Sequence, residues 1–161
     1  MSRHFDNFDS TLGSHQPYAT PEPEPVASLD GLRILVIEDH ALTRLAMECL
    51  LTSWGCRVTL ADGALMACDK VRHAEAPDII LSDYQLNDGY DGLNAIRLVR
   101  ELAGSQIPAC LISADVDQTL VLQAQAAGVY FWQKSVQTAK LRSMLCRLHL
   151  PEDALWLIGQ T

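Results

Sequence analysis

The sequence predicts an α/β fold in which five β–α repeats form a doubly wound parallel sheet. Two observations carry this prediction. From residue 31 onward, short apolar runs of β type alternate with segments whose apolar residues recur at helical spacing. Four of the apolar runs also end at a polar side chain, as expected for strands that deliver groups to the C-terminal edge of an open sheet. This alternation favours a parallel sheet covered by helices on both faces.

The five expected strands are short runs of mainly aliphatic and aromatic residues. They are Leu32–Ile37, Arg57–Leu60, Ile79–Ser82, Ala109–Ile112 and Val129–Gln133. All but the second stop at a charged or hydroxyl side chain. In chain order, these groups are the pair Glu38-Asp39, then Asp83, Ser113 and Lys134.

A helix is expected after each strand. The apolar residues of the first share one face at helical spacing, and they are Leu42, Leu45, Ala46, Cys49 and Leu50. Gly55 is a plausible end for this helix. The other four helices are expected at residues 64–74, 93–102, 120–127 and 136–150. Right-handed crossovers between the strands then favour the flavodoxin-like strand order 2-1-3-4-5.

In this order the first and third strands are neighbours, so Glu38, Asp39 and Asp83 converge at one edge of the sheet. Three adjacent carboxylates repel one another unless a cation lies among them. Mg²⁺ is the expected cofactor because it takes oxygen ligands. One carboxylate could then attack phosphorus, while Lys134 and Ser113 stabilise the phosphoryl oxygens. The pattern predicts a site for phosphoryl transfer.

Composition narrows the remaining classes of function. The chain has 20 acidic and 12 basic residues and a net charge of −8, which argues against nucleic-acid binding because phosphate contacts need clustered Lys and Arg. No apolar stretch reaches the ~18 residues of a membrane span, and no signal peptide is recognisable. The five cysteines show no CxxC spacing and are expected to be buried thiols in a reducing compartment. We therefore expect a cytoplasmic protein.

Three parts are expected along the chain. Residues 1–30 are rich in Pro and Glu without apolar periodicity, so they are expected to be a disordered extension or linker. Residues 31–150 form the folded domain, and residues 151–161 form a short tail. The tail begins like a helix at Pro151 and carries Trp156 among other apolar residues. We expect it either to fold back on its own domain or to contact a partner, including a second copy in a homodimer.

Four segments together resemble the receiver domain of two-component response regulators. They are Ile34–Asp39, Pro77–Asp83, Ile112–Ala114 and Lys134, in this order and at this spacing. Each motif is weak alone, but the ordered set is specific and covers most of the chain outside the N-terminal extension. Residues 83–92 look closest to the receivers of hybrid sensor kinases.

The resemblance implies a role for each residue of the site. Asp83 is similar to the phosphoacceptor, Asp39 to the direct metal ligand, and Glu38 to the outer ligand that acts through water. The backbone carbonyl of Gln85 would complete the Mg²⁺ site, and Lys134 would contact the phosphoryl group. The implied phosphodonor is a sensor histidine kinase or a histidine phosphotransfer protein. The module would not be an enzyme in its own right, although it would assist its own phosphorylation and dephosphorylation.

Ser113 and Phe131 resemble the switch pair of the family, in which a hydroxyl is drawn to the phosphoryl group and an aromatic ring rotates in response. One residue departs from the family pattern, because Ser135 stands where proline usually follows the lysine. A cis peptide before a non-proline residue costs about 2.5–4 kcal/mol. The sequence leaves open whether the Lys134-Ser135 peptide is cis or trans, and a trans peptide would place the Lys134 ammonium farther from the phosphoryl site.

Two other functions remain open at this point. A degenerate receiver would serve only as an interaction surface, independent of phosphorylation. A phosphohydrolase with an Asp nucleophile would need a second Asp two residues beyond it, and that position holds Gln85. Only eleven residues follow Leu150 in the sequence, so the signal is expected to pass through protein contacts.

Overall fold

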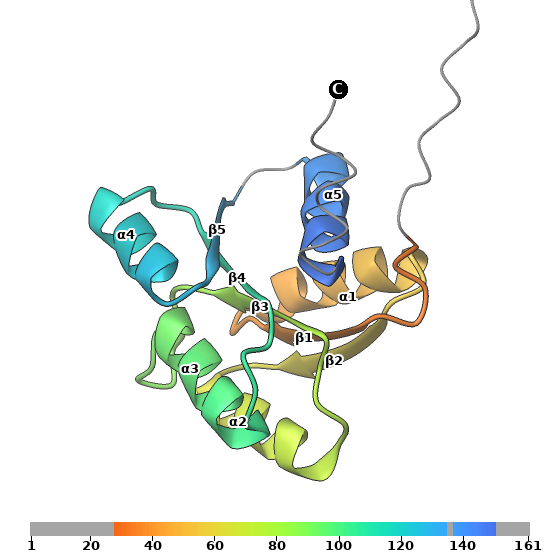
Figure 1. Cartoon of the computed structure of the whole chain (residues 1–161), viewed down its shortest axis with the longest axis horizontal. Coiled ribbons are helices and arrows are strands. Elements are labelled where there is room, and N and C mark those ends of the chain that lie inside the picture. Colours follow the sequence, from red (N-terminus) through yellow and green to blue (C-terminus); the bar gives the residue numbers. More distant parts are fainter. Residues whose placement is uncertain (1–27, 135–136, 151–161) are drawn as a thin grey trace, which may run out of the picture.

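The structure, a computed structural model, describes residues 28–134 and 137–150, which contain one parallel sheet of five strands (Figure 1). The strands are β1 (Arg33–Ile37), β2 (Arg57–Ala61), β3 (Ile79–Asp83), β4 (Ala109–Ser113) and β5 (Tyr130–Gln133). Their order across the sheet is β2-β1-β3-β4-β5. The doubly wound α/β class and the strand order predicted from the sequence are both confirmed.

A helix follows each strand, and the helices cover both faces of the sheet (Figure 1). They are α1 (Ala41–Ser53), α2 (Ala64–His73), α3 (Gly92–Ala103), α4 (Gln118–Ala126) and α5 (Thr138–His149). Helices α1 and α5 lie on one face, and α2, α3 and α4 lie on the other. The last helix was expected from residue 136, which lies outside the described residues, and in the described part it begins at Thr138.

The core consists of two apolar layers, one on each face of the sheet. Alternate side chains of β1 belong to different layers: Ile34 and Val36 pack with α1 and α5, whereas Leu35 and Ile37 pack with α2, α3 and α4. None of these four residues is more than 2% exposed. Because both faces are covered, the central strands are apolar throughout instead of alternating, which is why the sequence shows them as continuous runs.

Helix α1 buries a different face from the one indicated by its spacing. Leu42 is 73% exposed and Leu45 is 53% exposed, whereas Leu51 is completely buried and Met47 packs partly against the core. Apolar residues extend around much of α1, so their spacing alone does not identify the inner face. The outer face of α1 is therefore an apolar surface.

The prediction that all five cysteines are buried is wrong for Cys49, which is exposed on the outer face of α1. Cys68 is partly buried, and the remaining three, Cys56, Cys110 and Cys146, are buried.

The folded core begins earlier than the sequence indicated. Leu29, which was expected in the extension, is 1% exposed and packs in the layer beneath α1 and α5. Its carbonyl accepts hydrogen bonds from the N–H of Leu32 at 3.1 Å and from the Cys56 thiol at 3.6 Å. The rest of the expected extension and the C-terminal tail, residues 1–27 and 151–161, lie outside the described residues. None of the helices described combines the length and the hydropathy that crossing a membrane requires.

Arg100 of α3 is a buried cation that holds together two loops at the N-terminal edge of the sheet. It is 9% exposed. Its Nε donates to the carbonyl of Ile107 at 2.9 Å, and its two Nη atoms donate to the carbonyls of Ala127 and Gly128 at 2.8 and 3.0 Å. Burial lowers the pKa of the guanidinium. The side chain therefore joins α3 to the start of β4 and to the turn between α4 and β5.

At the same edge of the sheet, Arg33 of β1 and Asp78 form a bidentate ion pair. The Arg33 Nε and Nη2 atoms donate to Asp78 at 3.1 and 2.8 Å, and the Arg33 backbone N–H donates at 2.8 Å. The hydrogen bonds and charge of Arg33 lower the pKa of the Asp78 carboxyl below its ordinary value of 3.8.

Replacing Asp78 with asparagine is expected to lower the free energy of unfolding at pH 7 by about 1 kcal/mol. A group whose folded-state pKa is depressed stabilises the fold above its unfolded pKa, so the effect is complete above about pH 5 and disappears as the pH falls through the folded pKa. Urea unfolding of wild type and Asp78→Asn at several pH values measures the difference. Asp69→Asn, which changes an exposed carboxylate of α2, is the control. A difference between Asp78→Asn and wild type that does not vary with pH would contradict this account.

Candidate functional site

The polar ends of the strands meet at one edge of the sheet. In the β1–β3 ladder Ile37 lies opposite Ser82, so the next residues, Glu38 and Asp83, emerge side by side. In the β3–β4 ladder Asp83 lies opposite Ile112, which precedes Ser113. The arrangement follows from parallel pairing, which places the C-terminal ends of all these strands together.

Glu38, Asp39 and Asp83 form a cluster of three carboxylates. One carboxylate oxygen of each lies within 4.8 Å of the other two. Glu38 is only 7% exposed, and the other two residues are partly buried. The cluster predicted from the sequence is therefore present, and it combines burial with concentrated negative charge.

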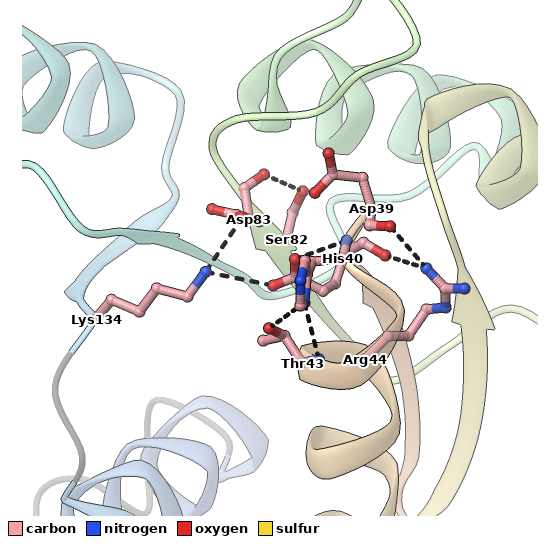
Figure 2. Close-up of polar contacts among 8 residues, drawn as sticks. Asp39, His40, Thr43, Arg44, Ser82, Asp83 and Lys134 are labelled. Carbon is pink, nitrogen blue, oxygen red and sulfur yellow. Dashed lines mark hydrogen bonds and ion pairs between the residues drawn. The ribbon is translucent and has the colours of Figure 1, made fainter.

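Lys134 joins this cluster from the end of β5 (Figure 2). Its Nζ lies 3.3 Å from Asp83 Oδ2 and 3.5 Å from Glu38 Oε2. The ammonium therefore lies beside Asp83 and not in the displaced position that a trans peptide before Ser135 would have given. The Lys134 backbone N–H donates to the carbonyl of Ser113 at 2.7 Å, so β4 fixes the root of the side chain before the chain reaches Ser135. Ser135 itself lies outside the described residues.

Burial and mutual charge shift the protonation of the site. Burial raises the pKa of Glu38, and the Asp83 charge raises it further, against lowering by the His40 backbone N–H and by Lys134. Burial lowers the pKa of Lys134, but attraction to Asp83 and Glu38 outweighs it and the net shift is upward. The ammonium is thus held in its charged form beside two carboxylates.

The loop after Asp83 packs tightly against α3. Gly92, at the start of α3, donates its N–H to the Tyr84 carbonyl at 2.8 Å. A Cβ on Gly92 would overlap the carbonyl oxygen of Asp83, so only glycine fits without moving Asp83. Gln85 pairs through its backbone with Asp91. The role of the Gln85 carbonyl as a metal ligand stays a prediction.

The two residues of the expected switch pair lie on neighbouring strands. Ser113 is 3% exposed, and its Oγ accepts a hydrogen bond from the Asp115 N–H at 3.2 Å. Phe131 is partly buried and packs against the core layer formed with α2, α3 and α4. Their placement is compatible with the pairing, and their movement in response to a phosphoryl group stays a prediction.

His40, next to the acidic pair, is the N-cap of α1. It occupies the position before the first helical residue, and its Nδ1 is 3.1 Å from the Thr43 hydroxyl oxygen (Figure 2). Its backbone N–H donates to Glu38 Oε1 at 3.1 Å. His40 therefore caps the start of α1 with its side chain and holds the Glu38 carboxylate with its backbone N–H.

Sequence reasoning missed Arg44, which contacts the backbone of the site, and Asp88, in the loop that follows Asp83. Arg44 of α1 donates through Nη1 to the backbone carbonyls of Glu38 and Asp39 (Figure 2). Asp88, in the loop after Asp83, accepts from the Leu65 N–H at 3.4 Å and so caps α2, whose N-cap Gly63 has no side chain. A cation on the first turn after an acidic pair was the available signal for Arg44. No local pattern indicated Asp88.

The donor set fits a hard divalent cation. Three carboxylates offer only oxygen atoms, with no thiol or imidazole among the clustered groups. Such sites suit Mg²⁺, which prefers oxygen ligands and keeps several waters. A dication would also relieve the repulsion among three carboxylates that Lys134 alone offsets only in part.

Comparison with known proteins gives a consistent result. The sequence profile of the response regulator receiver domain matches residues 34–146. The chain is 29% identical over 126 residues to the sensory/regulatory protein RpfC of Xanthomonas campestris pv. campestris, which covers 76% of this chain and 17% of RpfC. It is 26% identical over 134 residues to the two-component response regulator ARR16 of Arabidopsis thaliana, covering 74% of this chain and 81% of ARR16. The chain thus spans less than a fifth of the length of RpfC.

A solved structure extends the similarity to the fold. The receiver domain of sensor histidine kinase PA1611 from Pseudomonas aeruginosa PAO1 has a TM-score of 0.62 and 27% identity, covering 74% of this chain and 98% of that one. The crystal structure of that receiver domain contains a magnesium ion coordinated in the active site cleft. The profile match covers more than half of the sequence, and the strand order agrees with it. The chain belongs to the family of response regulator receiver domains of two-component systems.

Proposed function

We propose that this receiver accepts a phosphoryl group on Asp83 from a phosphohistidine, in a reaction that requires Mg²⁺. The observation that carries the proposal is the convergence of Asp83 with Glu38, Asp39 and Lys134 at the edge of the sheet. The name of PA1611, a sensor histidine kinase, supports a kinase of this class, or a histidine phosphotransfer protein, as the donor. The signal then passes to a partner through protein contacts.

The transfer uses Asp83 as the nucleophile. A carboxylate oxygen of Asp83 forms a bond to phosphorus while the bond between phosphorus and the histidine nitrogen breaks, and that electron pair returns to the imidazole. Lys134, which already touches Asp83 Oδ2, neutralises charge on the phosphoryl oxygens. Ser113 ends β4, the strand next to β3, and its hydroxyl donates to the bound phosphoryl group. Phe131 on β5 follows the movement of Ser113.

Glu38 and Asp39 would hold the metal together with Asp83 and the Gln85 carbonyl. When bound, Mg²⁺ supplies positive charge between the carboxylates and the incoming phosphoryl oxygens. Without the metal, the carboxylates and the phosphoryl group repel each other strongly. Among the described residues, the cation that pairs with carboxylates of the cluster is Lys134, and its single charge does not balance three carboxylates. Mg²⁺ dependence is thus a direct consequence of the charge balance.

Mass spectrometry after incubation with acetyl phosphate and Mg²⁺ tests the function. We expect one added phosphoryl group per chain and none when EDTA replaces the metal. Purified kinases with a phosphohistidine should give the same product. A chain that binds Mg²⁺ but takes up no phosphoryl group from either donor would instead be a degenerate receiver, which acts by interaction alone.

The two acidic residues after β1 are expected to differ in their effect on metal affinity. Asp39→Asn should weaken Mg²⁺ binding roughly 100-fold or more, because it removes a direct ligand, whereas Glu38→Gln should weaken it about 10-fold through the outer contacts. Trp132 lines a cavity with Glu38 and Lys134, so its fluorescence is a suitable readout. Asp69→Asn removes an equal charge far from the site and should bind as wild type does. Equal losses for the two site variants would show that their roles are not distinct.

A further inference from the structure

The loop between β1 and α1 is held by one guanidinium. β1 ends at Ile37, and α1 begins at Ala41, so the carbonyls of Glu38 and Asp39 lie between the two elements. Arg44 Nη1 donates to the Glu38 carbonyl at 2.7 Å and to the Asp39 carbonyl at 3.2 Å (Figure 2). The Arg44 N–H itself bonds to the His40 carbonyl at 2.9 Å, as part of the helix. A single side chain on the first turn of α1 thus spans two successive carbonyls.

The Arg44 guanidinium donates to backbone carbonyls, whereas the carboxylates of Glu38 and Asp83 are paired with another cation. In the described part of the chain, the ion pairs of Glu38 and Asp83 are with Lys134. Lys134 and Arg44 approach the cluster from opposite sides (Figure 2). The two cations therefore act differently: Lys134 neutralises carboxylate oxygens, and Arg44 fixes the chain that bears them.

We infer that Arg44 is a positioning residue of the metal site. By tying down two consecutive carbonyls, it fixes the peptide plane between Glu38 and Asp39 and so sets the direction in which both side chains leave the backbone. Mg²⁺ demands near-octahedral ligand positions, so a loosened loop would lower its affinity. Groups that orient metal ligands from outside typically contribute 10–100-fold to affinity. The inference rests on the proposed role of Glu38 and Asp39 as metal ligands.

The direction of the change in Mg²⁺ affinity distinguishes this inference from a simple charge effect. A guanidinium near a dication opposes metal binding, so removing the charge alone would strengthen Mg²⁺ binding. Loss of positioning has the opposite sign and weakens it. A purely structural role in α1 would lower the stability of the fold and leave the affinity of the folded protein unchanged.

Calorimetric titration of the metal-free full chain with Mg²⁺ provides the test. Arg44→Met, which keeps the length of the side chain without its donors, should weaken Mg²⁺ binding about 10-fold. Arg44→Lys keeps the charge and can reach a carbonyl, so it should recover part of the loss. Arg97→Met is the matched control, because Arg97 is exposed on α3 and pairs with Glu101. It should bind as the wild type does.

A second measurement needs no metal. The His40 N–H donates to Glu38 Oε1, so hydrogen exchange at His40 reports how firmly the loop is held. It should accelerate in folded, metal-free Arg44→Met and stay unchanged in Arg97→Met. Unchanged or tighter Mg²⁺ binding by Arg44→Met, beside a wild type that binds, would overturn this inference alone. A wild type that does not bind Mg²⁺ would overturn the proposed function and this inference with it.

Discussion

Replacing Asp83 with asparagine is expected to abolish phosphorylation of the chain completely. The amide keeps the shape of the side chain but has no anionic oxygen to attack phosphorus, and no other carboxylate takes the same place at the end of β3. The variant should fold at least as firmly as wild type, because one of three mutually repelling carboxylates has lost its charge. Intact-mass measurement after incubation with acetyl phosphate and Mg²⁺ provides the readout.

Asp88→Asn is the matched control for this experiment. Asp88 lies in the loop that follows Asp83, and its carboxyl oxygen accepts the Leu65 N–H at the start of α2. An asparagine oxygen can accept the same hydrogen bond, so this variant should be labelled as wild type is. Labelling of Asp83→Asn to the wild-type extent would remove Asp83 from its proposed role.

The second large effect is expected in stability, from Arg100→Met. The substitution roughly preserves apolar bulk but leaves the carbonyls of Ile107, Ala127 and Gly128 without their donors. Hydrogen bonds from charged donors contribute about 1.5–3 kcal/mol each, part of which offsets the cost of burying the cation. We expect the free energy of unfolding to fall by about 2–4 kcal/mol.

Urea unfolding measures this loss, and two further variants identify its cause. Arg97→Met removes an exposed arginine of the same helix, paired with Glu101 at 2.6 Å, and should cost at most about 0.5 kcal/mol. Arg100→Lys should lose almost as much as Arg100→Met, because one ammonium cannot reproduce the planar fork that reaches three carbonyls. Equal stability of Arg100→Met and Arg97→Met would show that the buried hydrogen bonds contribute little.

The sheet and the cluster of carboxylates could be predicted because each depends on a pattern visible along the chain. Apolar runs that end in a carboxylate, a hydroxyl or an ammonium, in parallel strands of known order, have only one edge at which to meet. Asp83 and the pair Glu38-Asp39 therefore lie where the sequence placed them. The family resemblance, confirmed by the comparisons, supplied roles but not distances.

The errors arise where a contact depends on a distant segment. Ser135 suggested that Lys134 could be displaced. The Lys134 N–H instead bonds to the carbonyl of Ser113 on β4, so the Lys134 backbone is fixed independently of the residue that follows it. In α1, apolar residues surround the helix, and only packing against α5 and the sheet decides that Leu51 faces inward. Arg100 bonds to the backbone carbonyls of Ala127 and Gly128, 27 and 28 residues along the chain, and no residue spacing reveals such contacts.

The unusual exposure of Cys49 makes the native chain a ready substrate for single-site labelling. Burial raises the pKa of the Cys56, Cys68 and Cys110 thiols, that of Cys110 to about 12, so these side chains are poor nucleophiles near neutral pH. A maleimide dye would therefore attach first at Cys49, on the outer face of α1. The dye would lie on the helix whose first turn holds the loop that carries Glu38 and Asp39. Its emission would then report the binding of any protein that covers this apolar face, and the chain would need no engineered cysteine.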